Sequence, residues 1–143
     1  MELKVKKLQS SAIIPQYATA GAACFDIHAV ECVRLPPYWR QTIKTGLAFE
    51  VPEGYALMVY SCSGHGAKKG VRLANCTGVI DSDYRGELMV ALSNDSQDEF
   101  VVEAGDRIAQ AMLVKVPRVD LVEVNELSET ERGAGGFGST GTR

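Results

Sequence analysis

The side chains best suited to chemistry stand in a polar segment, residues 81–87, that lies between two apolar runs. This segment holds two carboxylates, Asp81 and Asp83, followed by the ring of Tyr84. Two β-prone runs around a short polar segment with a late glycine predict a hairpin. A carboxylate at its tip could act as a general base, next to a ring that packs against a ligand. The alternative, a solvated turn decorated with charges, is equally consistent with these residues alone.

Two further polar side chains stand inside β-prone runs, where polar residues are unusual unless they are solvated, paired or part of a site. Residues 22–29 alternate so that Asp26 shares a face with His28, and Gln110 interrupts the apolar run 108–116. Aspartate is disfavoured in strands, so Asp26 either faces water at an edge or serves a site. We interpret His28 as a surface residue. Gln110 either pairs with backbone groups inside a buried strand or reaches a ligand.

Two glycine-containing stretches could contact an anion. In residues 61–70, Ser63-Gly64 leads into a short Ala/Lys piece, which could expose backbone N–H groups at the start of a helical turn or form a plain turn. Residues 132–143 are too rich in glycine to be rigid without a ligand, and composition alone favours a disordered tail. Yet this tail carries a guanidinium, a ring and hydroxyls, which could close over a base and a polyphosphate: Arg132, Phe137, Ser139 and Thr140.

The elements that must position these residues are short strands. The β-prone runs 41–45, 47–51 and 56–60 are separated by turn signals, Gly46 being the first of them, and helical periodicity is almost absent from the sequence. Many short strands with frequent turns predict an all-β barrel or jelly roll. The run 108–116 is apolar on both faces and must be covered on both. A subunit interface is one way to supply the second cover.

Length and composition limit the function classes. A chain of 143 residues that is 45% hydrophobic and has a formal charge of −3 predicts one soluble domain. A mildly acidic chain has no field to hold a nucleic-acid backbone, so no nucleic-acid partner is expected. No apolar run reaches membrane-spanning length, and no signal segment is recognisable at the N-terminus. The four cysteines form no CxxC pair and are expected to be buried free thiols in a reducing cytosol, which predicts a cytoplasmic protein.

Several of these segments together resemble one enzyme family. Residues 78–87, Gly-Val-Ile-Asp-Ser-Asp-Tyr-Arg-Gly-Glu, are similar to the third of five signature motifs of trimeric dUTP pyrophosphatases, the dUTPases. Residues 22–29, 61–70, 105–110 and 132–141 resemble the first, second, fourth and fifth motifs. There are two departures: Cys62 stands where the second motif has arginine, and Cys24 stands where many members have glycine in the first.

The resemblance implies a fold, an assembly and a reaction. It implies a jelly-roll-like β-barrel of the β-clip type over residues 1–131 and a flexible, lid-forming arm over residues 132–143. It further implies a homotrimer in which each active site is assembled from three chains. The reaction would convert dUTP and water to dUMP and pyrophosphate, with Mg²⁺ on the phosphates and Asp26 reaching that metal through water.

The resemblance also assigns roles to single residues. Asp81 would take a proton from the water that attacks the α-phosphorus, and Tyr84 would pack against the deoxyribose so that a 2′-hydroxyl clashes. For Asp83 and Arg85 the spacing alone, without the resemblance, allows either an ion pair or interface contacts that would stiffen the hairpin. The residues expected around the substrate are Cys62, Ser63, Gly64, Asn75, Gly78, Val79, Ile80, Tyr84, Gln110, Arg132, Phe137, Gly138, Ser139 and Thr140.

Cys62 leaves other functions open. A thiol offers neither the charge nor the forked geometry of arginine, so the triphosphate grip should weaken unless another cation compensates. A dUTPase-like nucleotide-binding regulatory protein with weakened catalysis is therefore one alternative. A second is a dCTP deaminase-type relative, although no matching glutamate motif is seen. A third, a structural β-sandwich trimer, leaves the tail motif without a purpose.

Overall fold

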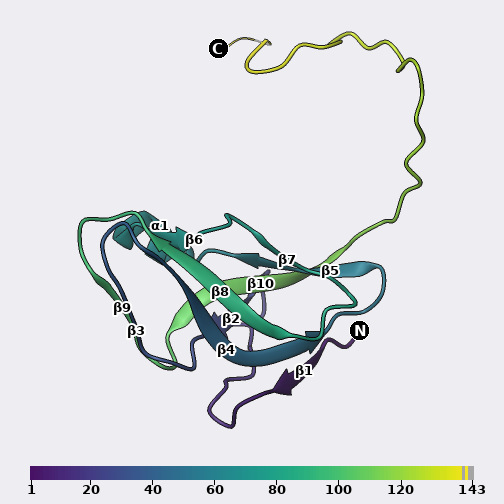
Figure 1. Ribbon diagram of the computed structural model, residues 1–143. Coiled ribbons are helices and arrows are strands. Elements are labelled where there is room, and N and C mark those ends of the chain that lie inside the picture. Colours follow the sequence, from purple (N-terminus) through teal and green to yellow (C-terminus); the bar gives the residue numbers. More distant parts are fainter. Residues whose placement is uncertain (140, 142–143) are drawn as a thin grey trace.

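The computed structural model describes residues 1–139 and 141, in which short antiparallel strands form two packed layers (Figure 1). One sheet has the order β1-β4-β8-β6, the other has the order β2-β10-β5-β7, and β3 pairs with β9. The strands are β1 (Lys4–Lys7), β2 (Phe25–His28), β3 (Val33–Leu35), β4 (Arg40–Glu50), β5 (Tyr55–Tyr60), β6 (Val71–Leu73), β7 (Gly78–Ile80), β8 (Glu87–Asn94), β9 (Phe100–Val102) and β10 (Arg107–Lys115), and α1 (Ser63–Lys69) is a short helix. The all-β, jelly-roll expectation is confirmed.

The core lies between the two sheets and follows the alternation of the strands. In β2, Phe25 and Ile27 are buried while Asp26 and His28 are only partly covered. His28 is therefore not the surface residue that the sequence predicted, because its Nδ1 atom is buried. Fully buried Leu and Ile side chains from both sheets meet in the same cluster. Each such side chain contributes roughly 1.5–3 kcal/mol of transfer free energy, so the alternation fixes which faces meet.

A buried amide fastens the loop that follows β8. Asn94 is fully buried, and its Nδ2 atom donates hydrogen bonds to the carbonyl oxygens of Leu35 (3.0 Å) and Asp98 (2.7 Å). Its Oδ1 atom accepts a hydrogen bond from the Ser96 backbone N–H at 3.0 Å. A buried amide must be paired in this way, since an unsatisfied one costs about 1–3 kcal/mol. The end of β8 is thereby held against β3.

The sequence predicted that Gly46 separates two strands, and this prediction is wrong. The chain runs through it as the single strand β4, with a register shift against β8 between Lys44 and Ala48. Gly46 takes a positive φ of 67°, which favours glycine, and its N–H donates to the Glu87 carboxylate at 2.8 Å. The glycine therefore marks a β-bulge inside one long strand.

The predicted hairpin around residues 81–87 is also wrong as a pairing. β7 pairs with β5 and β8 pairs with β4 and β6, so the two flanking strands belong to different sheets. The polar segment is a crossover turn from one sheet to the other. The alternation of a strand defines its faces, but it does not identify its hydrogen-bonding partner.

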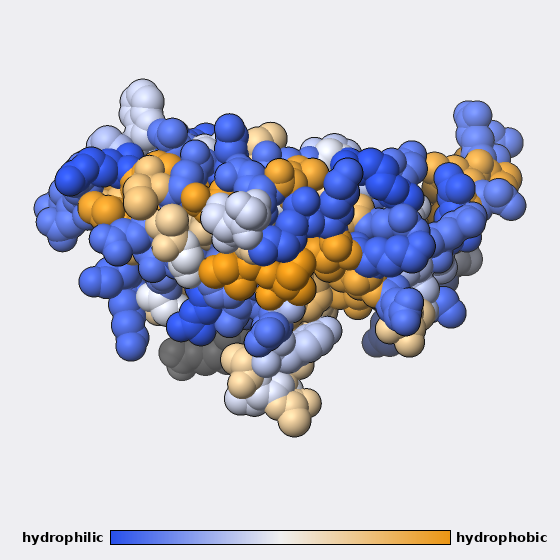
Figure 2. Space-filling view, turned by 90° about the horizontal axis from the view of Figure 1, so that it is seen from below, coloured by the Kyte–Doolittle hydropathy of each residue, from blue (hydrophilic) through white to orange (hydrophobic). Residues whose placement is uncertain are grey.

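The chain leaves the two-layer body after β10 and extends away from it (Figure 1). Apolar side chains along this extension are exposed, namely those of Val119, Leu121, Val122, Val124 and Leu127. Apolar side chains also gather on one face of the body, bordered by hydrophilic ones (Figure 2).

Over the described residues, no helix has the length and apolar character needed to cross a membrane.

Candidate functional site

One pocket collects polar side chains from three separate parts of the sequence. It encloses about 240 Å³ between β2, the start of α1 and β10. Asp26 and Gln110 face each other across it because they are paired residues of the antiparallel strands β2 and β10. Its lining residues are Asp26, Cys62, Ser63, Gly64, His65, Arg107 and Gln110. The structure thus brings together the predicted residues of the first, second and fourth motifs.

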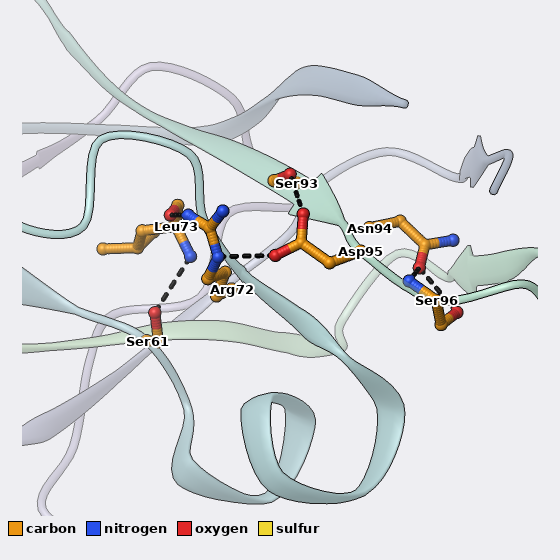
Figure 3. Close-up of polar contacts among 7 residues, drawn as sticks. All are labelled: Ser61, Arg72, Leu73, Ser93, Asn94, Asp95 and Ser96. Carbon is orange, nitrogen blue, oxygen red and sulfur yellow. Dashed lines mark hydrogen bonds and ion pairs between the residues drawn. The ribbon is translucent and has the colours of Figure 1, made fainter. Parts of the chain in front are cut away.

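The loop that carries Cys62 to Gly64 is held by contacts at both of its ends (Figure 3). At its start, the Ser61 hydroxyl accepts a hydrogen bond from the Leu73 N–H at 2.9 Å, which ties the end of β5 to β6. At its far side, the Arg72 guanidinium pairs with the Asp95 carboxylate at 2.6 Å, which also accepts a hydrogen bond from Ser93. α1 begins at Ser63, so the predicted helical turn is present.

Gln110 and Cys62 are both anchored to neighbouring backbone. The Gln110 Nε2 atom donates to the Ser61 carbonyl oxygen at 2.9 Å, so the backbone-paired interpretation of this amide is confirmed. The Cys62 thiol lies 4.0 Å from the Arg107 carbonyl oxygen. Burial, with a smaller contribution from the Asp26 carboxylate, raises the pKa of the Cys62 thiol to about 11. The thiol is therefore uncharged at neutral pH.

The turn between β7 and β8 places Asp81 and Tyr84 on one pocket of about 210 Å³. The Tyr84 hydroxyl donates to the Glu87 carbonyl oxygen at 3.0 Å, which fixes the ring across the turn. A side chain at Gly86 would lie 2.4 Å from that hydroxyl, so glycine is required there for the ring to occupy this position. Val79, Ile80, Glu87 and Met89 complete the lining.

Arg85 stiffens the turn without the predicted carboxylate partner. Its guanidinium donates to the carbonyl oxygens of Ser82 (2.7 Å) and Tyr84 (3.0 Å). Among the ion pairs of the described residues, Arg85 and Asp83 do not form one. The ion-pair alternative is therefore wrong for the described residues of this chain.

Asn75 and Gly78 lie at the start of β7, beside the end of β5. A Cβ atom at Gly78 would approach the Val59 side chain to 3.1 Å and the Asn75 amide to 3.9 Å. The backbone of Gly78 is therefore packed closely, with the Asn75 amide next to it. Cys76 between them has a positive φ of 63°, which turns the chain sharply.

Within one chain the predicted site residues remain in separate groups. The group at Asp26 and the turn at Asp81 line different pockets. In the arm, the Arg132 guanidinium donates to the Gly135 carbonyl oxygen at 2.8 Å, and the Phe137 ring is fully exposed. Gly138 and Ser139 follow it in a turn, and Thr140 lies outside the described residues.

Arg107 and His65 line the first pocket although the sequence did not single them out. Strand alternation places Arg107 on the face opposite Gln110, but a register shift between Arg107 and Ala109 brings both side chains to one pocket. His65 packs edge-on against Phe100, with ring centroids 5.2 Å apart, and burial lowers the pKa of its imidazole. A bulge leaves no periodic signal in the sequence, so alternation alone could not find Arg107.

The cysteines are free thiols, as predicted. All four lie in the described part of the chain and none is in a disulfide. Cys32 and Cys76 are exposed, and Cys24 and Cys62 are only partly covered, so the expectation of burial is wrong.

Comparison with known proteins identifies full-length relatives. A family model described as dUTPase matches residues 10–141. The deoxyuridine 5′-triphosphate nucleotidohydrolase of Nautilia profundicola is 50% identical over 141 residues, which cover 99% of each chain. The protein of the same name from Helicobacter pylori is 43% identical over 141 residues, covering 99% of this chain and 97% of that protein.

Solved structures of the same kind share the fold. The dUTPase of Staphylococcus bacteriophage 80alpha, determined with dUpNHpp, superposes with a TM-score of 0.92 at 31% identity, covering 99% of both chains. A variant dUTPase of phage phi11 of S. aureus superposes with a TM-score of 0.84 at 26% identity, covering 90% of this chain and 100% of that one. Its structure describes the coordination of a structural Mg(II) ion.

Proposed function

The chain belongs to the dUTPase family, and on this basis we propose that it hydrolyses dUTP to dUMP and pyrophosphate. The observation that carries the proposal is the turn after β7, which presents the Asp81 carboxylate and the Tyr84 ring at one pocket. Family membership over the whole chain supports the enzyme class, dUTP diphosphatase. The assignments to single residues below are our proposal.

Asp81 acts as the general base. Its carboxylate is exposed at the pocket, where a water molecule has access to it. It takes a proton from this water as the water oxygen attacks the α-phosphorus of dUTP. Pyrophosphate then leaves from the opposite side. The β7–β8 turn holds the base in position because Tyr84 and Arg85 are both bonded to carbonyls of the same segment.

Tyr84, Asn75 and the start of β7 select the nucleoside. The Tyr84 ring packs against the deoxyribose, so that a ribonucleotide with a 2′-hydroxyl is excluded. The Asn75 amide and the backbone of Gly78, Val79 and Ile80 pair with the edge of uracil. The narrow turn would leave no room for a methyl group at C5 of the base, which would exclude dTTP. A site built from polar pairing discriminates strongly, because a wrong base leaves buried groups unpaired.

The pocket at Asp26 holds the phosphates. Ser63 and Gly64 lie at the start of α1, where backbone N–H groups have no acceptor within the helix, and Gln110 stands opposite. The donor set fits Mg²⁺ that is bound mainly by substrate and water. Asp26 supplies one carboxylate, and the described residues contain no cluster of three metal-binding side chains. When bound, Mg²⁺ would neutralise phosphate charge, with Asp26 reaching it through water.

We further propose a homotrimer with shared sites. The two pockets are separate within one chain, and the arm from residue 132 approaches neither of them through the contacts of its described residues. Neighbouring chains would complete each site, with Arg132, Phe137, Gly138, Ser139 and Thr140 of one arm closing over it. Exposed apolar side chains at 119–127 and an apolar pocket beside β1 give neighbouring chains surfaces to cover.

Pyrophosphate release from a nucleotide panel tests this function. With Mg²⁺, we expect release from dUTP and little from dCTP, dTTP or UTP, because the turn and the β7 edge reject the other bases and the ribose. Chelation of the metal should lower the rate with dUTP. Ammonia release from dCTP would instead indicate a deaminase. Binding of dUTP without turnover would indicate a nucleotide-binding regulatory protein.

A further inference from the structure

We propose that Arg107 of β10 supplies the phosphate-binding guanidinium that Cys62 cannot supply. Arg107 would thereby take the place of the arginine that is missing from the second motif. This inference rests on the proposed function, since it assigns the phosphates of dUTP to the pocket at Asp26. Arg107 is the first residue of β10, whereas Cys62 is the N-cap residue of α1 and lies 45 positions earlier in the chain.

The geometry places Arg107 next to the position that Cys62 leaves without a charge. The Cys62 thiol touches the Arg107 backbone carbonyl at 4.0 Å, and both residues line the same pocket with Ser63 and Gln110. The register shift in β10 turns the Arg107 side chain to this side. A guanidinium here can therefore reach the same phosphates that an arginine at 62 would hold. Its forked donors suit two phosphate oxygens at once.

Arg107 is free to make this contact at little cost. Its guanidinium meets the Asp26 carboxylate at 3.4 Å, and its side chain is 64% exposed. The Asp26 side chain is only 23% exposed, but the pair is long and its arginine end faces solvent, so the guanidinium can turn to a triphosphate without a large loss of stability. Release of Arg107 would also leave the Asp26 carboxylate available to a metal-bound water.

No other residue on the described lining of this pocket offers a positive charge for the phosphates. His65 is the other basic residue of the pocket, and burial lowers the pKa of its imidazole, which keeps it neutral at pH 7 and above. The partly covered Cys62 thiol, with its pKa raised to about 11 by burial, adds no negative charge to repel the phosphates. Arg107 is thus the one permanent cation among the described residues of this pocket.

A double-mutant cycle on Arg107 and Cys62 tests the inference. The variants Arg107→Gln, Cys62→Arg and the double variant are compared with the unmodified chain. The readout is binding of the dUTP analogue dUpNHpp by calorimetry. Arg107→Gln should weaken binding by about 10- to 150-fold, as expected for loss of a hydrogen bond to a charged group. Cys62→Arg alone should bind dUpNHpp at least as tightly as the unmodified chain, because it adds a second guanidinium to the same pocket.

The decisive result is rescue. In the Cys62→Arg background, Arg107→Gln should lower the affinity for dUpNHpp by no more than about twofold, because the arginine introduced by Cys62→Arg takes over the phosphate contact. Arg107→Lys, which keeps the charge but loses the fork, should retain part of the affinity. The matched control is Arg34→Gln, since Arg34 of β3 forms an exposed ion pair at 2.6 Å with Glu99, which precedes β9, and neither residue lines the Asp26 pocket. It should leave binding unchanged.

Two outcomes would overturn the inference: no loss of affinity in Arg107→Gln beyond that of Arg34→Gln, or an equal loss in both backgrounds. The second outcome would mean that Arg107 acts only on the fold or on Asp26. Failure of the proposed function is distinguishable from both. In that case neither the unmodified chain nor Cys62→Arg would release pyrophosphate from dUTP.

Discussion

Replacement of Asp81 by asparagine should leave dUpNHpp binding intact while dUTP turnover falls by roughly 10²- to 10⁴-fold, the usual contribution of a general base. The amide keeps the shape of the carboxylate, so the β7–β8 turn should be preserved. It cannot accept the proton of the attacking water at neutral pH. Steady-state pyrophosphate release and analogue binding on the same preparation separate the two effects.

Asp83 offers the matched control for this substitution. It lies in the same turn, it is exposed, and it makes no ion pair with Arg85 in the described structure. Asp83→Asn removes one charge from the same surface, so it should leave turnover close to that of the unmodified chain. Near-full turnover in Asp81→Asn, or an equal fall in both variants, would mean that the base is misassigned.

Removal of residues 132–143 should abolish most turnover and leave the oligomer unchanged. The described part of this arm carries the exposed Phe137 ring and the Arg132 guanidinium, which bonds only within the arm. Such a segment adds little to assembly, but as a lid it would exclude water and complete the phosphate contacts. Loss of positioning of this kind costs on the order of 10²-fold or more.

Sizing by light scattering and pyrophosphate release from the same truncated chain check both halves of this expectation. The apolar side chains of residues 119–127 are retained in it, so the surfaces proposed for the trimer are kept. A truncated chain that stays active would mean that the arm does not act as a lid. Dissociation to monomers would mean that the arm contributes to assembly.

Much of the fold could be predicted from the sequence because the strands show their buried faces locally. The alternation at residues 22–29 placed Phe25 and Ile27 in the core and left Asp26 toward the pocket, as the structure has it. Hydrogen-bonding partners are set by distant parts of the chain, and there the sequence failed. β7 and β8 flank one turn yet join different sheets, and Gly46 lies inside a single strand.

The candidate site was predictable where it follows motifs and was missed where it depends on a bulge. Cys62, Ser63, Gly64 and Gln110 line one pocket with Asp26, as the motif order suggested. Arg107 was missed because the register shift in β10 changes its face. The separation of the Asp26 pocket from the β7–β8 turn within one chain could not be predicted from motif order, because motif order carries no information on distances in the folded chain.

Hydrolysis of dUTP in water enriched with oxygen-18 tests the central claim most directly. If water attacks the α-phosphorus, the label should appear in dUMP and pyrophosphate should stay unlabelled, which mass spectrometry of the two products distinguishes. Label in pyrophosphate would show attack at the β-phosphorus. Release of inorganic phosphate in place of pyrophosphate would show cleavage between the β- and γ-phosphates of dUTP. Either of these results would contradict the role assigned here to Asp81 and to the pocket that holds the phosphates.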